Sequence, residues 1–485
     1  MDFSSYFTTT DFRGILPEVS LLLTAVVILT FEMLARPRRQ VMLILSLFGI
    51  TVAGGYVWQN SGAEMVLFGG MLTLNSYSTF FDSLYLVVAA AALLVAQVYL
   101  ERRGGELRGE YYSLILFATI GMMLMTRAND LVVIFLGLEL LSLSLYVLVG
   151  FLRHDVLSNE GGIKYLLLGA FSTGFFLFGA ALAYGATGTT NFEGIAAAIA
   201  SGNVFSSTVL DLGIGLLIVG FAFKVAVVPF HMWSPDVYQG APTSVTAFLC
   251  TAPKAAGFGA LLKLFLVAFS VEGGAWQDLF WLLAVLTMTV GNISALVQSN
   301  IKRMLAFSSV AHAGYLLIGV MVMDVAGTSS VMFYLLVYSA MNLGAFGVVS
   351  FVEDQENGLS FDDYRGLASR HPWLSIVLAL FMLSLAGFPP TAGFVAKYGL
   401  FSAAVAKGYI WLVVIAVLNT LASFYYYARL IVKMYMEAEE EALTAFPSIH
   451  STILLTILAA VILLFGLTPG WLIENTTLAA AVFSP

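Results

Sequence analysis

Three lysines, Lys224, Lys254 and Lys397, lie inside long apolar stretches of the sequence. An ionisable residue near the centre of a bilayer costs roughly 2.5–3.5 kcal/mol, so three of them cost roughly 8–10 kcal/mol, which is comparable with the stability of a whole domain. Burial can lower the pKa of a lysine by several units, so that it releases a proton near neutral pH. Lysines in this setting indicate a proton relay. The alternative is a set of structural ion pairs or side chains that snorkel to the membrane surface.

Two further ionisable residues lie in apolar stretches. Glu139, in LVVIFLGLELLSLSLYVLVG, can hold a neighbouring lysine in its charged form, and separation of the pair would let the lysine lose its proton. His312, in MLAFSSVAHAGYLLIGV, can carry a proton near neutral pH or simply join two helices. The predicted relay is Glu139, Lys224, Lys254, His312 and Lys397. Polar residues that would hold bridging waters, or only join helices, are Ser308, Ser309, Tyr338, Ser339 and Asn342.

The elements that position these residues are predicted to be transmembrane helices. The 485 residues are 60% hydrophobic and 10% charged, against about 45–50% and about 25% in soluble domains. A span needs about 20 mostly apolar residues. We therefore expect an all-α polytopic membrane protein forming a single membrane domain, 1–485, with residues 191–202 as a loop rather than a short interfacial helix. The fourteen predicted spans are 16–35, 41–58, 77–100, 111–127, 130–150, 161–186, 208–229, 243–267, 278–298, 302–323, 328–352, 372–399, 408–434 and 449–471.

The basic residues of the loops and span ends predict the orientation. If the loop after the first span is cytoplasmic, fourteen basic residues fall on that side and four on the other, as the positive-inside rule requires. Both termini are then non-cytoplasmic. The length of the chain and the clear asymmetry of its basic residues favour a bacterial plasma membrane. The cytoplasmic set is Arg36, Arg38, Arg39, Arg102, Arg103, Arg108, Arg153, Lys164, Lys302, Arg303, Arg365, Arg370, Arg429 and Lys433. The opposite set is Arg13, Arg127, Lys263 and Lys407.

The sequence offers no sign of a redox centre. Cys250 is the one cysteine, which excludes a disulfide framework, a cysteine-ligated Fe–S cluster and a CxxC site within the chain. The five histidines show no close pairing suited to haem or zinc. There is no GxGxxG after a strand and no P-loop. We expect no cofactor in this chain.

Prolines accompany the three lysines. A proline removes a backbone donor and frees a carbonyl one turn earlier. In a membrane such a break is tolerated where neighbours or water satisfy the freed groups, so broken helices at these positions would mark an ion path. The pairs are Pro229 with Lys224, Pro253 with Lys254, and Pro389 and Pro390 with Lys397.

The chain shows an internal repeat with an offset near 173 residues. The offset relates Lys224 to Lys397 and Glu139 to His312, and LGAF at 168–171 recurs at 343–346. A shift of five spans reverses orientation, so we expect two inverted five-helix repeats with broken helices. Lys254 has Tyr427 as its counterpart, which makes this lysine the predicted link between the halves. The predicted parts are three N-terminal helices in 1–100, repeats in 111–267 and 278–434, and a last helix in 449–471.

Three stretches resemble a known family. GFAFKVAVVPFHMWSPDVYQGAPTSVTAFL (220–249) resembles the span 7–8 signature of the antiporter-like membrane subunits of respiratory complex I, NADH:quinone oxidoreductase. Its PFHMWSPDVYQGAP segment is similar to the subunit N (subunit 2) family. NIKRMLAFSSVAHAGYLLIG (300–319) and MLSLAGFPPTAGFVAKY (382–398) resemble the same subunits. The resemblance in span count and length covers essentially the whole chain. The lack of a long lateral helix argues against subunit L, and Lys397 in place of glutamate argues against subunit M.

The resemblance implies a non-redox, proton-translocating subunit. FMN, Fe–S clusters and quinone would belong to partner subunits, and the neighbours would be subunits M, K and J. Glu139 would be the span 5 glutamate that pairs with the span 7 lysine, Lys224. Lys254 would be the bridging lysine, Lys397 the exit-side lysine, and His312 a residue of the connecting path.

Two other functions fit part of this pattern. A subunit of an Mrp-type multisubunit cation/proton antiporter would share the fold and the lysines, and residues 229–242 favour complex I over it. A structural spacer would have no use for the buried charges. Nothing in the sequence suggests a nucleic-acid partner.

Overall fold

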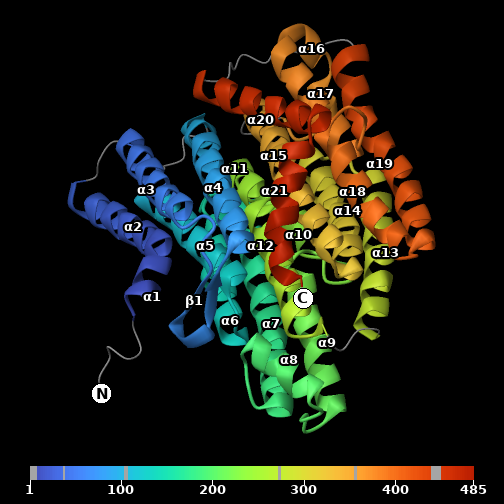
Figure 1. Cartoon of the computed structure of the whole chain (residues 1–485). Coiled ribbons are helices and arrows are strands. Elements are labelled where there is room, and N and C mark those ends of the chain that lie inside the picture. The colour runs from blue at the N-terminus through green and yellow to red at the C-terminus, as the bar shows by residue number, and fades with distance from the viewer. Residues whose placement is uncertain are drawn as a thin grey trace.

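The apolar stretches of the sequence form helices because a helix satisfies its own backbone groups in lipid. The computed structural model describes residues 8–35, 39–102, 108–270, 275–353, 358–437 and 449–484. Within these ranges, thirteen helices are long and apolar enough to cross a membrane, and they form one elongated bundle (Figure 1). The prediction of an all-α polytopic membrane protein is confirmed. These helices are α2 (Leu16–Ala35), α3 (Arg39–Gln59), α4 (Ser76–Arg102), α5 (Gly109–Arg127), α6 (Leu131–Val149), α7 (Val156–Thr187), α9 (Ser207–Lys224), α11 (Thr243–Leu249) with α12 (Ala252–Val267) as one span, α13 (Ala275–Leu296), α14 (Ile301–Val322), α15 (Val325–Val352), α19 (Ile410–Met436) and α20 (Ile449–Leu467).

Three predicted spans are broken, each beside the proline that predicted the break. The span predicted at 208–229 stops at Lys224, and α10 (Ser234–Gly240) resumes the helix. Cys250 and Thr251 separate α11 from α12, whose first turn holds Pro253. The span predicted at 372–399 is two short helices, α17 (Pro372–Ala386) and α18 (Ala392–Ala406). The span predicted at 372–399 was therefore too short at its end, and the one predicted at 208–229 was too long.

Several elements were not predicted. Residues 191–202 are not a loop: α8 (Phe192–Ala200) forms there, because Asn191 caps its first turn and Phe192 and Ile195 bury one face. The last predicted span ends at Leu467 rather than 471, and α21 (Gly470–Ala480) follows Pro469 and packs on α15 and α4. The remaining elements are α1 (Thr9–Gly14), β1 (Met65–Leu67), β2 (Leu72–Leu74), α16 (Leu367–Arg370) and the short 3₁₀ turns at 68–70, 361–364 and 481–483.

Backbone pairings show which connections share an end of the bundle. At one end, the antiparallel β1–β2 hairpin pairs Leu72 with Ala128, and Asp130 pairs with Asn191. We call this the hairpin end. At the other end, Asn300 pairs with Ser360, and we call it the 360 end. Both groupings agree with the predicted alternation of spans.

The assignment of the 360 end to the cytoplasm stays a prediction. Arg36, Arg38 and Arg103, on which it partly depends, lie outside the described residues. Three other members of the charge sets are not solvated as expected. Arg127, Lys263 and Lys302 are 1%, 2% and 1% exposed, because each is held by partners that are distant in the sequence.

The centre of the bundle consists of α12, α14 and α15, whose residues are almost all buried. The two inverted repeats stay a prediction, and one feature departs from a uniform offset. Adding 173 to the first break, 225–233, gives 398–406, which lies inside α18, whereas the second break is at 387–391. Lys224 therefore precedes its break and Lys397 follows the other.

The close approach of α17 and α18 predicts that Gly393→Ala destabilises the second break. A Cβ at Gly393 would collide with the backbone carbonyl oxygen of Ser384. Displacement of packed helices typically costs about 1–3 kcal/mol, so the midpoint of thermal unfolding in detergent should fall. Gly185→Ala is the matched control, because a Cβ there meets nothing within 4 Å. Equal midpoints for the two variants would contradict this prediction.

Candidate functional site

One face of α14 carries the central polar residues of the site. Ser308, Ser309, His312 and Tyr315 are spaced so that they share a side of the helix, and all four are at most 2% exposed. Lys254 on α12 and Lys397 on α18 approach this face from the two ends. Three of the six groups brought together here by α12, α14 and α18, namely Ser308, Ser309 and Tyr315, were not among the five predicted relay residues. The helix that connects the lysines is thus itself polar along its length.

Lys254 lies in the first turn of α12, directly after the break. Its Nζ donates to the carbonyl oxygen of Ser309 at 2.6 Å and to the Ser309 hydroxyl at 2.5 Å. The ammonium also lies 5.8 Å from the centroid of the Tyr338 ring. A helix N-terminus carries a partial positive charge, so these neutral oxygens supply the acceptors that the lysine would otherwise lack.

His312 bridges three helices. Its Nδ1 lies 2.5 Å from the Tyr334 hydroxyl of α15, and its Nε2 lies 3.2 Å from the Tyr427 hydroxyl of α19. Tyr427 also contacts the Ser308 hydroxyl at 2.5 Å. Each hydroxyl can donate or accept, so the proton on the imidazole can face either side. Tyr427 is the residue that the 173-residue offset assigned to Lys254, and the two side chains contact adjacent serines of α14.

Lys397 uses the carbonyls that a broken helix leaves free. α17 ends at Ala386, and the last carbonyls of a helix have no partner within it. The Lys397 Nζ donates to the carbonyl oxygens of Leu385 at 3.0 Å and Ala386 at 3.1 Å. It also lies 5.0 Å from the centroid of the Tyr315 ring. The break therefore provides the oxygen ligands for the lysine, as its proline pair predicted.

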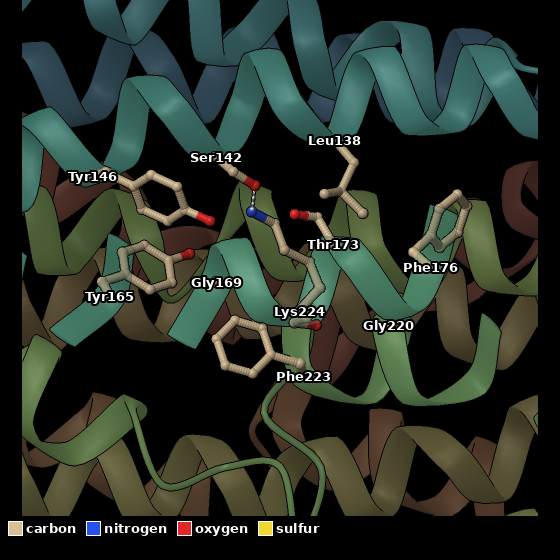
Figure 2. Close-up of a pocket in the computed structure, with 11 residues that line it drawn as sticks. Leu138, Ser142, Tyr146, Tyr165, Gly169, Thr173, Phe176, Gly220, Phe223 and Lys224 are labelled. Atoms are coloured by element: carbon tan, nitrogen blue, oxygen red, sulfur yellow. Dashed lines mark hydrogen bonds between the residues drawn. The ribbon is translucent and has the colours of Figure 1, made fainter. Parts of the chain in front are cut away.

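Lys224 ends α9 and points between α6 and α7 (Figure 2). Its Nζ donates to the hydroxyl of Ser142 at 2.9 Å. The hydroxyls of Tyr146, Tyr165 and Thr173 face the same space in Figure 2. The cavity there offers about 10 Å³ to the centre of a water molecule, which is on the order of one water.

Glu139 does not pair directly with Lys224. It is partly exposed on α6, one turn before Ser142. It is close enough to act electrostatically on Lys224, but no ion pair joins the two within the described part of the chain. Ser142 takes the position in contact with the lysine. The predicted pairing is thus an interaction at a distance in this structure.

The sequence also pointed to some of the residues around the relay and missed others. Tyr338 and Asn342 of α15 were among the polar residues predicted to hold waters, whereas Tyr334, one turn before Tyr338, was not predicted. Both the Tyr338 hydroxyl and the Asn342 Oδ1 are buried with no hydrogen-bond partner among the described residues. No local sequence pattern pointed to Tyr427, because its side chain reaches His312 from a helix more than a hundred residues away in the sequence.

The fold and the buried lysines define an antiporter-like membrane protein. Residues 128–423 match the family described as NADH:quinone oxidoreductase/Mrp antiporter, transmembrane. The chain is 48% identical to NADH-quinone oxidoreductase subunit N of Trichlorobacter lovleyi over 96% of each chain. The chain belongs to the subunit N family of NADH-quinone oxidoreductase.

Solved structures share the fold. A chain of respiratory complex I from Thermus thermophilus is 32% identical, with coverage of 94% of this chain and 98% of that one and a TM-score of 0.82. A chain of the Mrp complex from a Dietzia species has a TM-score of 0.83 at 21% identity, with coverage of 98% and 97%. The second likeness concerns the fold alone. The assignment to NADH-quinone oxidoreductase rather than to an Mrp complex therefore depends on the sequence relatives.

The contact between Lys254 and Ser309 predicts that Ser309→Ala destabilises the protein. The substitution removes one acceptor from a buried ammonium, and loss of such a bond typically costs about 1–3 kcal/mol. Thermal unfolding of the purified protein in detergent measures the change. Ser402→Ala is the control, because its hydroxyl bonds only to the Gly399 carbonyl on an exposed face of α18. A Ser309→Ala variant as stable as the control would show that the bond contributes little.

Proposed function

We propose that the chain translocates protons as a non-redox subunit of a membrane-bound NADH:quinone oxidoreductase. In this role it is part of a translocase, and electron transfer elsewhere in the complex supplies the free energy. The observation that carries the proposal is the set of three buried lysines at three helix breaks, linked through the polar face of α14. Family membership supports the assignment to complex I, since the relatives bear that name.

Between Lys254 and Lys397, the groups of the proposed proton path lie close to one another. Lys254 contacts Ser309, and His312 follows one helical turn later on α14. The Tyr338 ring lies beside both, 5.8 Å from the Lys254 Nζ and 5.2 Å from the imidazole centroid. The Tyr315 ring likewise lies between His312 and Lys397, with centroid distances of 5.8 Å and 5.0 Å. Tyrosine hydroxyls both donate and accept, so small rotations would pass a proton along this line.

Lys224 connects to the same line from the other side. α9 packs on α12, and a Cβ added at Gly257 would lie 3.7 Å from the Lys224 Cγ. Gly257 is one turn after Lys254 on α12, so the two lysines lie on neighbouring surfaces of adjacent helices. Glu139 adds a negative charge within electrostatic range of Lys224. Motion of that charge relative to Lys224 would change how firmly the lysine holds its proton.

The redox groups of such a complex would be held by other subunits. Cysteine-ligated Fe–S clusters need several cysteines, and the sequence has only Cys250, which is buried. FMN, Fe–S clusters and quinone are therefore proposed for the partner subunits. The proposed membrane neighbours are subunits M, K and J, in a bacterial plasma membrane with both termini on the non-cytoplasmic side.

An Mrp-type cation/proton antiporter is the competing function, and it shares the fold. The subunit N relatives and the 229–242 stretch both support complex I instead. A direct comparison is sodium-driven proton exchange in membrane vesicles without NADH. The proposal expects none that depends on this chain, and exchange lost with Lys224 would favour the antiporter.

Neutralising Lys224 is expected to lower proton pumping. In vesicles with the assembled complex, Lys224→Met should reduce severalfold the protons translocated per NADH oxidised, because no group at the end of α9 would then carry a proton. Lys407→Met is the matched control, since Lys407 is 46% exposed and forms a surface ion pair with Asp324, worth about 0–1 kcal/mol. Normal pumping by an assembled Lys224→Met complex would sink the proposal and favour a structural spacer.

Tyr427→Phe is expected to slow pumping by removing one hydroxyl. That hydroxyl joins Ser308 to His312, whereas the ring and its packing would remain. Tyr425→Phe is the control, because Tyr425 is largely exposed on the same helix. The measurement is the initial rate of NADH-driven proton uptake with equal amounts of assembled complex. Equal rates for both variants would remove Tyr427 from the path.

A further inference from the structure

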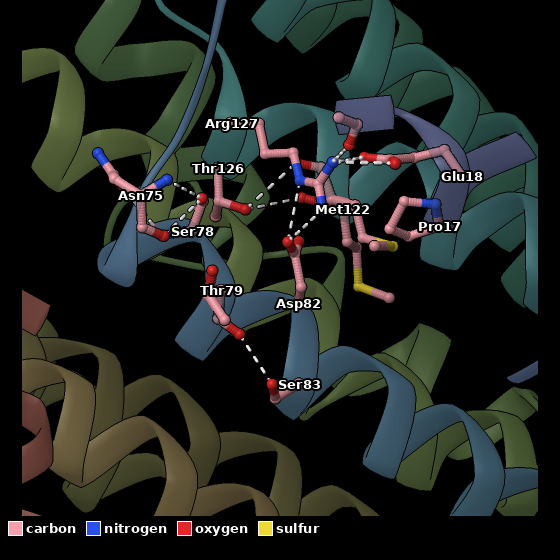
Figure 3. A network of polar contacts seen from close by, with 12 residues as sticks. Pro17, Glu18, Asn75, Ser78, Thr79, Asp82, Ser83, Met122, Thr126 and Arg127 are labelled. Atoms are coloured by element: carbon pink, nitrogen blue, oxygen red, sulfur yellow. Dashed lines mark hydrogen bonds and ion pairs between the residues drawn. The ribbon is translucent and has the colours of Figure 1, made fainter. Parts of the chain in front are cut away.

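A second group of buried charges lies at the hairpin end, away from the relay just described. We call Glu18, Asp82, Arg127 and Lys263 the hairpin-end cluster. They come from α2, α4, α5 and α12 and are at most 4% exposed. The Arg127 guanidinium lies between the two carboxylates, 2.8 Å from Glu18 and 2.7 Å from Asp82, as Figure 3 shows for these three residues. The cluster thus ties the N-terminal helices to the span that carries Lys254.

Lys263 is the member that can exchange a proton. Arginine stays protonated in proteins, whereas lysine does not when buried. The Lys263 Nζ donates to the carbonyl oxygens of Arg127 at 2.9 Å and Thr126 at 3.3 Å, and to the Thr73 hydroxyl at 2.7 Å. All three acceptors are neutral. With two carboxylates and two cations the cluster is neutral when fully ionised, and loss of one proton from Lys263 would leave it with a single negative charge.

Stability alone gives a weak reason for such a cluster. Taking charges out of water costs several kcal/mol per ion, and packed apolar side chains are often as stabilising as a buried ion pair. Arg127 already pairs with both carboxylates. The Asp82 Oδ1 is buried with no hydrogen-bond partner among the described residues, so the cluster has an acceptor to spare. This is an arrangement that can take up a proton as well as release one.

The cluster has neighbours on both its solvent side and its interior side. Toward solvent, the exposed Glu193 of α8 is close enough to act electrostatically on Lys263. Toward the interior, Tyr85 lies one turn deeper than Asp82 on α4, and its buried hydroxyl lies beside Thr126 and within electrostatic range of Asp82. Lys254 is nine residues before Lys263 on α12, about 14 Å at 1.5 Å per residue. That separation requires intermediate carriers, and Asp82, within electrostatic range of Lys263, and Tyr85, within electrostatic range of Asp82, are the candidates.

We propose that Lys263 is a fourth proton-exchanging lysine and that the hairpin-end cluster is a proton-release site to the aqueous phase at that end. An N–H bond of the Lys263 ammonium breaks, and the proton passes to water beside Glu193 as hydronium. The neutral amine then takes its next proton from the interior by way of Asp82 and Tyr85. This inference rests on the proposed function and adds an outlet that the Lys224-to-Lys397 line does not include.

Lys263→Arg tests the inference, because arginine keeps the charge and the donors but does not release its proton. In the assembled complex we expect NADH oxidation to continue while the protons translocated per NADH fall. Lys407→Arg is the matched control at the exposed surface and should leave the ratio unchanged. A purely structural cluster would tolerate Lys263→Arg, so an assembled variant with a normal ratio overturns the inference.

A second variant decides the matter if Lys263→Arg fails to assemble. Glu193→Gln changes an exposed side chain, so folding is not at risk, and removal of its charge should lower the ratio. An unchanged ratio in Glu193→Gln would then overturn the inference. Lys224→Met in the same assay keeps the two claims apart: if it lowers the ratio while the hairpin-end variants do not, only the release site falls. If Lys224→Met pumps normally, the proposed function itself falls.

Discussion

A lysine ammonium in an apolar interior needs hydrogen-bond acceptors, and in this protein each of the three relay lysines lies beside a helix break. Each of the three contacts neutral oxygens: the Ser142 hydroxyl of α6 for Lys224, Ser309 of α14 for Lys254, and the last carbonyls of α17 for Lys397. Only the α17 carbonyls are supplied by the break itself. No carboxylate forms an ion pair with these three within the described residues. Arg127, by contrast, is held between two carboxylates. Neutral acceptors stabilise an ammonium without fixing its charge, which suits the proton-exchanging role proposed for these lysines.

The position of α14 follows from the same constraint. It is almost entirely buried, so its polar face can only meet polar groups from α12, α15, α18 and α19. At the 360 end, Asp236 of α10 bonds to Lys164 of α7 and Arg303 of α14, both at 2.7 Å. This network holds the segment after the first break against the start of α14. These contacts hold the lysines, the helix breaks and α14 together as one packed unit.

Hydropathy located thirteen of the predicted spans as helices long enough to cross a membrane, and the fourteenth as the shorter pair α17 and α18. Prolines beside lysines located the three breaks, because both signals are local. Contacts between distant segments were not predictable in the same way. Glu139 was expected to pair with Lys224, but Ser142, one turn along α6, contacts the lysine instead. Tyr427 reaches His312 from α19, and Lys263 and Arg127 are buried by Glu18, Asp82 and Thr73 from the N-terminal region. The 173-residue offset pairs Lys224 with Lys397 in the sequence but does not predict the breaks, since Lys224 precedes its break and Lys397 follows the other.

Proton counting can show whether protons pass between the two halves of the chain through Lys254, as proposed. The measurement is the number of protons translocated per NADH oxidised by the assembled complex carrying Lys254→Met, with complex content verified in the same vesicles. We expect a lower ratio than in the unmodified complex, because Ser309 and Tyr338 would face a side chain that holds no proton. An unchanged ratio at full assembly would contradict it.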